Sequence, residues 1–117
     1  MSAQRVVKGA IKFDKDSNSI TFACYIVDAF AKLQVVFDGR FDHGRVGDWH
    51  RIDDADFIFN INILGNLNNK EFAFKGYRGD GRFNIEMPNN ISLSGRFASA
   101  SSTVLLEGKG TFKLRSF

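Results

Sequence analysis

Apolar and polar residues alternate along most of the chain. Between Arg5 and Phe13, for example, Val7, Ile11 and Phe13 fall on one face and lysines on the other. A period of two predicts a strand with one face buried and the other in solvent. No segment shows the 3.6-residue period of a helix, so the pattern predicts strands almost throughout. The phenylalanines expected to point inward are Phe13, Phe22, Phe37, Phe57, Phe59, Phe72, Phe74, Phe83, Phe97 and Phe112.

Residues that favour turns separate the alternating segments. Asp80-Gly81 predicts a tight hairpin, and Pro88-Asn89-Asn90 predicts a second corner. Gly108-Lys109-Gly110 predicts a turn between the last two strands. An alternating segment from Phe57 to Ile63 predicts one strand that ends before the turn over 65–69.

About eight to nine short strands joined mostly by hairpin turns predict an all-β domain over residues 1–117, arranged as an antiparallel meander. Gly9, Gly76 and Gly95 fall on inward faces, which favours the strong coiling that a closed barrel needs. A barrel also leaves no open strand edge. We therefore expect a small barrel, with a two-sheet sandwich as the alternative. The expected architecture resembles the small barrels of the lipocalin and avidin type.

Composition narrows the possible functions only a little. The formal net charge is +3, without a run of basic residues, which argues against a nucleic-acid partner. Cys24 is the single cysteine, so no internal disulfide can form. No apolar run approaches the length needed to span a membrane. We therefore expect a cytoplasmic protein that binds neither nucleic acid nor membrane.

The stretch from Asp38 to Asp56 contains both histidines and the only tryptophan, and we expect it to form a long loop. A tryptophan face offers apolar contact, while histidine, arginine and aspartate orient polar groups. This stretch is therefore the predicted binding site. The expected ligand-binding residues are Trp49, His43, His50, Arg51, Asp48 and Arg40.

Two kinds of chemistry are weaker alternatives for the same stretch. His43 and His50 with Asp42 or Asp48 could bind a metal, but their spacing matches no familiar metal motif. Histidine and aspartate could also transfer protons, but alternation points Asp54 and Asp56 outward, and no nucleophile motif is present. Cys24 falls on an inward face and is expected to be a core residue. We expect no metal, no cofactor and no catalytic residue, and favour a binding protein over an enzyme.

The favoured function is binding of a small, partly apolar molecule at the mouth of a phenylalanine-lined barrel. The phenylalanines are enough to fill the interior, which is the favoured interpretation. Gly9, Gly76 and Gly95 would, however, leave room beside them. The stretch from Asp38 to Asp56 would then cover the opening.

Two other functions remain open. A lectin would bind sugars outside the barrel through Trp49 and the asparagine-rich turns. A structural protein would form homo-oligomers through apolar residues that point outward. These outward positions are Val6, Ala10, Val36, Ile58, Ala73, Tyr77 and Ala98.

Overall fold

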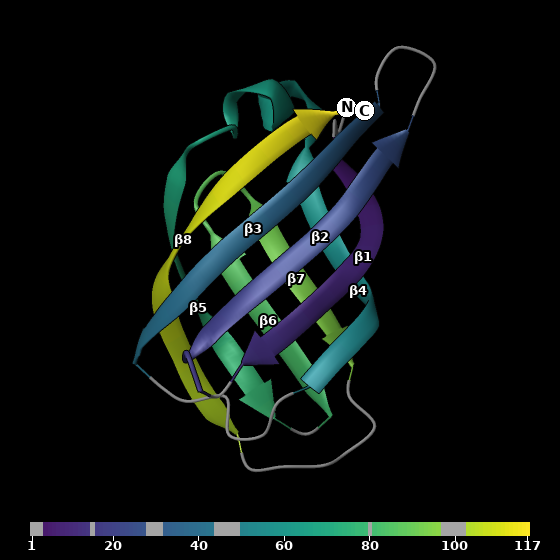
Figure 1. Ribbon diagram of the computed structural model, residues 1–117. Coiled ribbons are helices and arrows are strands. Elements are labelled where there is room, and N and C mark those ends of the chain that lie inside the picture. Colours follow the sequence, from purple (N-terminus) through teal and green to yellow (C-terminus); the bar gives the residue numbers. More distant parts are fainter. Residues whose placement is uncertain (1–3, 15, 28–31, 44–49, 80, 97–102) are drawn as a thin grey trace.

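Eight antiparallel strands close into one barrel in the computed structural model of the chain (Figure 1). The structure describes residues 4–14, 16–27, 32–43, 50–79, 81–96 and 103–117. For His43 and His50, which lie within these ranges, it describes the backbone but not the side chain. The strands are β1 (Gln4–Asp14), β2 (Ser19–Val27), β3 (Lys32–His43), β4 (His50–Asn60), β5 (Glu71–Gly79), β6 (Arg82–Met87), β7 (Ile91–Arg96) and β8 (Val104–Ser116). The predicted all-β class and closed barrel are confirmed, and the sandwich is not formed.

The order of strands around the barrel is β1-β2-β3-β8-β5-β6-β7-β4. In a simple meander each strand would lie beside the next, whereas here β8 lies between β3 and β5, and β4 lies between β7 and β1. The short turns after β1, β5 and β6 join neighbouring strands, but the longer connections after β3, β4 and β7 do not. We call the end at which β2 ends and β3 begins the upper end, as Figure 1 is drawn.

Most of the stretch from Asp38 to Asp56 is strand, so the predicted long loop is wrong for its described part. β3 continues to His43 and β4 already begins at His50. Gly39 interrupts the apolar alternation of the sequence, yet it pairs with Ile20 on β2 and with Gly110 on β8. Backbone pairing with two neighbours therefore continues the strand beyond the point where the side-chain pattern weakens.

β8 is one continuous strand, so the predicted turn at Gly108-Lys109-Gly110 is also wrong. Both glycines are buried and face the interior, where a Cβ at Gly110 would meet the ring of Phe37. They provide space for aromatic rings from neighbouring strands rather than flexibility for a turn.

The predicted strand from Phe57 to Ile63 ends early, at Asn60. The Asn60 side chain accepts a hydrogen bond of 2.9 Å from the backbone N–H of Asn62, which begins the 3-10 helix η1 (Ile61–Asn66). This turn brings Leu64 into the buried core, and Leu67 follows it. The segment thus covers the upper end of the barrel with apolar side chains.

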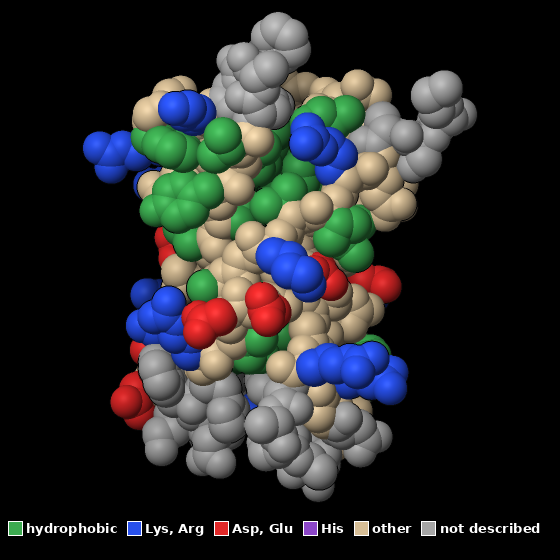
Figure 2. All heavy atoms as spheres, turned by 90° about the vertical axis from the view of Figure 1, so that its right-hand side faces the viewer, with side chains coloured by type: hydrophobic (Ala, Val, Ile, Leu, Met, Phe, Trp, Pro, Cys, Tyr) green, Lys and Arg blue, Asp and Glu red, His purple; other side chains and the backbone are tan. Residues whose placement is uncertain are grey.

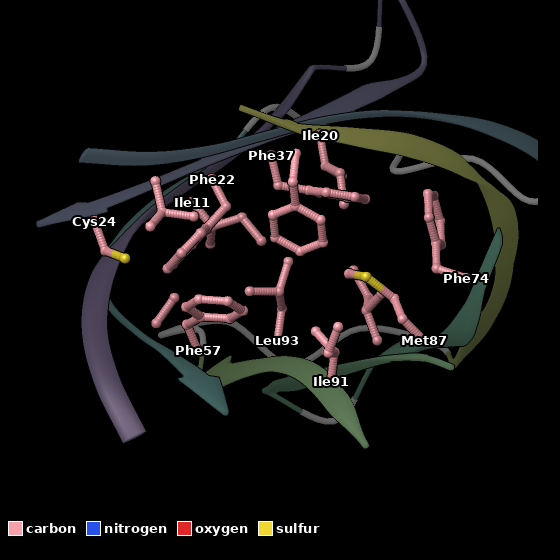
Figure 3. Packing of buried hydrophobic residues seen from close by; sticks show 14 of the residues in the cluster. Ile11, Ile20, Phe22, Cys24, Phe37, Phe57, Phe74, Met87, Ile91 and Leu93 are labelled. Carbon is pink, nitrogen blue, oxygen red and sulfur yellow. The ribbon is translucent and has the colours of Figure 1, made fainter. Parts of the chain in front are cut away.

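Phenylalanine rings fill the interior from one wall to the opposite one (Figure 3). Phe57 on β4 and Phe112 on β8 come from strands that are four positions apart around the barrel, yet their ring centroids are only 5.8 Å apart. Phe112 lies 4.7 Å from Phe37, and Phe57 stacks on Phe59 at 4.5 Å. These distances lie in the usual range for packed aromatic pairs. The described part of the interior is therefore a packed core, as the favoured interpretation predicted.

The glycines on inward faces leave no free room beside them, contrary to expectation. A Cβ at Gly9 would meet Phe22, and a Cβ at Gly95 would meet Phe83. At Gly76 it would meet the backbone of Asn84. Close packing against these glycines allows the strands to coil tightly, which is the other role that the sequence predicted for them.

Candidate binding surfaces

The structure describes two of the six predicted site residues in full. Trp49 and Asp48 lie outside the described residues, and the side chains of His43 and His50 are likewise not described. Arg40 and Arg51 are described in full, and both are exposed. The predicted site can therefore be placed only through its arginines and through the backbone of its histidines.

The backbones of His43 and His50 lie at the lower end of the barrel. His43 ends β3 and pairs with Glu107 on β8, whereas His50 begins β4 and pairs with Phe13 on β1. β1 and β2 separate these two strands in the barrel. The backbones of the two histidines therefore lie at different positions around the lower end of the barrel.

The two arginines lie on different parts of the outer wall. Arg40 on β3 lies between Ser19 on β2 and Lys109 on β8. Arg51 on β4 donates a hydrogen bond of 2.8 Å from its Nε to Asp53, and both side chains of this ion pair are exposed. An exposed pair of this kind contributes little to stability. Arg40 and Arg51 thus lie on strands that β1 and β2 separate.

Arg40 lines a hollow on the outside of the barrel, with a volume of about 530 Å³. Its lining is rich in hydroxyl and charged groups because alternate residues of β2 and β3 point outward here. The lining residues are Ser17, Ser19, Ile20, Thr21, Asp38, Gly39, Arg40, Asp42, Glu71 and Lys109.

A second hollow of about 490 Å³ shares Asp42 and Lys109 with the first. We call the two hollows together the outer groove. The second hollow adds apolar lining from the exposed Pro88 and from Phe74 and Met87, which point into the barrel and are only 3% and 7% exposed. Its other lining residues are Ala73, Lys75, Glu86, Glu107 and Gly108.

Strand register explains the charges of the second hollow. Lys75 on β5 pairs with Glu107 on β8 at one side and with Glu86 on β6 at the other. Ala73, two residues earlier on β5, pairs with Lys109. The small side chain of Ala73 leaves space between longer charged neighbours, which accounts for the hollow. Sequence analysis missed the groove because it depends on pairing between β5 and β8, which alternation does not reveal.

Large apolar side chains gather on the outside of the barrel near its upper end (Figure 2). Val6 on β1 is 57% exposed and pairs with Ile58 on β4. Tyr25 and Val27 on β2 are 59% and 61% exposed, and Phe117 is 61% exposed. We call these five residues the apolar face.

The apolar face is ordered by contacts among its own members. The rings of Tyr25 and Phe117 meet edge to face, with centroids 5.3 Å apart and planes at 81°. Gln34 donates a hydrogen bond of 3.4 Å to the Tyr25 hydroxyl. The backbone N–H of Phe117 donates to the carbonyl of Lys32 at 3.2 Å. The two rings therefore have defined positions on the surface.

Sequence analysis found two of the five residues of this face. Val6 and Ile58 were predicted as outward apolar residues, and the structure places them side by side. Tyr25 and Val27 were missed, although they alternate with the inward Cys24 and Ile26 and so had to point outward. The other predicted outward residues do not belong to this face. Val36 and Ala10 both pair with Ala23, and Ala73 lines the outer groove. Tyr77 pairs with Leu105, and Ala98 lies outside the described residues.

An ion pair borders the apolar face on its lower side. Lys8 on β1 donates a hydrogen bond of 2.9 Å from Nζ to Asp56 on β4. This hydrogen bond, the charge of Asp56 and the nearby charge of Asp54 raise the pKa of Lys8 above its usual value. Asp54 and Asp56 thus point outward, as the alternation predicted.

Cys24 is poorly suited to act as a nucleophile. Its side chain is 2% exposed, and burial raises the pKa of the thiol from 9.0 to about 12. The reactive thiolate is therefore scarce at neutral pH, and Cys24 is a core residue as expected.

Within the described ranges, no three histidine, cysteine, aspartate or glutamate side chains gather as metal ligands. Nor do these ranges contain a helix with the length and apolar character needed to cross a membrane.

The fold and its surfaces define a small, closed eight-stranded antiparallel β-barrel with a packed aromatic interior, an outer groove and an apolar face. No family model, curated protein or solved structure matches the chain.

Proposed function

We propose that the protein is a non-enzymatic binding protein whose small, partly apolar ligand lies in the outer groove. The observation that carries this proposal is the pair of adjoining hollows of about 490 and 530 Å³, which share Asp42 and Lys109. Volumes of this order suit small molecules, and most binding sites combine apolar lining with a few polar groups.

The packed interior favours the outer groove over the space inside the barrel. A ligand among the phenylalanines would have to displace rings that already touch across the barrel, such as Phe57 and Phe112. Native cores resist such insertion because added volume forces neighbours from their preferred positions. A ligand in the outer groove displaces only water.

The charges of the groove favour a ligand that carries both signs. Lys75 and Lys109 could bind a carboxylate, while Glu86, Glu107 and Asp42 could bind an ammonium group. Phe74, Met87 and Pro88 would contact an apolar body. An aromatic amino acid or a short peptide end has this combination of groups.

Three probes with the same aromatic body test this proposal. L-phenylalanine carries both charges, phenylpropionate only the negative one, and phenethylamine only the positive one. We expect saturable amide shifts in ¹H–¹⁵N spectra that include β5 and β8 near Ala73 and Gly108, with L-phenylalanine bound most tightly. Ala73 is exposed, so Ala73→Trp should fill the groove and abolish these shifts while the barrel stays folded.

A matched control places the same bulk elsewhere. Asn62 is exposed in η1, outside both hollows, so Asn62→Trp should leave binding unchanged. The proposal is wrong if none of the probes causes saturable shifts, or if Ala73→Trp binds as the unmodified chain does.

The lectin alternative receives less support from the asparagine-rich turns. Asn68 accepts a hydrogen bond of 2.9 Å from the backbone N–H of Leu114, and this bond ties the turn to β8. Asn89 and Asn90 adopt positive φ angles of 67° and 60°, a conformation that asparagine tolerates well. These asparagines have structural roles, and the role of Trp49 in sugar binding stays a prediction.

A further inference from the structure

We propose that the apolar face binds a second copy of this chain and forms a two-fold symmetric dimer. The face lies on β1, β2, β4 and Phe117, whereas the outer groove is lined from β2, β3, β5, β6 and β8 and from the turns beside them. No residue belongs to both surfaces. The dimer is therefore independent of ligand binding in the groove.

Exposure of this face to water is costly for a monomer. Six large hydrophobic side chains are exposed among the described residues, and Val6, Tyr25, Val27 and Phe117 account for four of them. Isolated exposed apolar residues are normal, but a contiguous group marks an interaction surface. Tyrosine and phenylalanine are also enriched at protein interfaces. The rings of Tyr25 and Phe117 already touch, so little side-chain order would be lost on binding.

The charges on either side of the face have opposite signs. On the β3 and β8 side, Lys32 pairs with Val27, and Arg115 and Lys113 follow on β8. On the β4 side lie Asp54 and Asp56, of which Asp56 is bound to Lys8. One flank is therefore basic. On the other, the net charge over Lys8, Asp54 and Asp56 is minus one, and Arg5 lies beyond Val6 at the upper end of β1.

This arrangement is complementary to itself. A two-fold axis that lies in the contact plane and runs parallel to the barrel brings the acidic flank of the second copy against the basic flank of the first. Complementary charges of this kind guide two surfaces into one register. An anionic membrane surface would attract the basic flank but repel the acidic one. A second copy satisfies both flanks at once.

A stable dimer would have to bury the apolar face together with its flanks. A standard interface buries roughly a tenth of a small protein's surface on each partner. The accessible area here is 7154 Å², so about 700 Å² would be needed. The face and its flanks lie on five of the eight strands, β8, β3, β2, β1 and β4, which run side by side. A closed two-fold contact also leaves no part of this face open for further growth.

The oligomeric state of the full chain tests the proposal. Sedimentation equilibrium from about 1 to 500 µM should give twice the chain mass at the upper concentrations, because standard interfaces have micromolar or tighter affinities. The double variant Tyr25→Ser, Val27→Thr should raise the dissociation constant at least about tenfold. The matched double variant Tyr77→Ser, Leu105→Thr removes exposed apolar side chains outside the face and should leave it unchanged.

Charge reversal tests the two-fold arrangement itself. Lys32→Glu and Asp54→Lys should each weaken the dimer, whereas the chain that carries both changes should regain affinity. Circular dichroism confirms that each variant keeps its strand content.

The proposal is overturned if the chain is a monomer at about 500 µM, if the Tyr25 and Val27 variant dimerises as the unmodified chain does, or if the combined reversal fails to restore affinity. Binding of the monomer to phosphatidylcholine vesicles through Tyr25 would overturn it equally. These outcomes do not bear on the outer groove, which the Ala73→Trp variant tests separately.

Discussion

Glycines inside the barrel determine how closely strands and phenylalanine rings approach each other. Gly110 on β8 faces the ring of Phe37, and a Cβ at Gly110 would overlap that ring. Phe37 cannot move aside easily because it is fully buried and packs on Phe112 at 4.7 Å. The absence of a side chain at this position is therefore part of the packing of the core.

We expect Gly110→Ala to reduce the free energy of unfolding by about 1 to 3 kcal/mol, the usual cost of overpacking a core. Gly65 offers a matched control, since a Cβ there would meet nothing within 4 Å. Gly65→Ala should change stability by no more than about 0.5 kcal/mol. Urea unfolding of the three chains measures both values. Equal stability of all three would contradict the packing around Phe37.

The face to which each residue points was the most predictable feature of this structure. Period-two alternation assigned the inward phenylalanines correctly, with Phe72 only half-buried and Phe97 outside the described residues. It could not tell that Gly108 and Gly110 belong to a strand, because a glycine carries no apolar side chain that marks its face. The same limitation hid the continuation of β3 through Gly39.

At the level of elements, the connection between β4 and β5 closes the upper end of the barrel. Backbone hydrogen bonds attach it to β8: the Asn69 N–H donates to Phe112 at 2.8 Å, and the Phe112 N–H donates to Lys70 at 3.1 Å. Leu67, 1% exposed, anchors the segment in the core. These contacts explain why a segment without regular strand pairing keeps a defined position.

Truncation of Leu67 measures how much this closure contributes. Leu67→Ala should lower the free energy of unfolding by about 2 to 4 kcal/mol, because it removes buried methyl groups and leaves a cavity. The same change at Leu105, which is 74% exposed, should cost no more than about 0.5 kcal/mol. Thermal or urea unfolding of both variants gives the comparison. A small loss at Leu67 would mean that the upper end is not closed by this segment.

Element boundaries were less predictable than residue faces. The end of β4 depends on a hydrogen bond between the Asn60 side chain and Asn62, which the alternating Phe57 to Ile63 pattern conceals. The early part of β4 and the late part of β3 depend on pairing with β1 and β8, which are distant in sequence. Long-range pairing of this kind overrides local pattern and turn composition.

For the whole molecule, closure and core follow from the two-faced pattern, but strand order does not. Nothing in the sequence places β8 beside β3 or β4 beside β1, because each of these pairings joins strands that are not consecutive. The outer groove and the charged flanks of the apolar face both depend on that order. Of the residues predicted for the site and described in full, Arg40 lines the outer groove, whereas Lys75 and Lys109 line it through pairings of β8 that the sequence does not reveal.

The central claim is that phenylalanines fill the barrel, so that ligands and partners meet its outer wall. Xenon enters apolar cavities that water leaves empty, and therefore reports directly on internal space. Crystals of the protein equilibrated under xenon pressure should show no xenon among Phe22, Phe57, Phe37 and Phe112. Strong xenon density in that region would show a hollow interior and contradict the account.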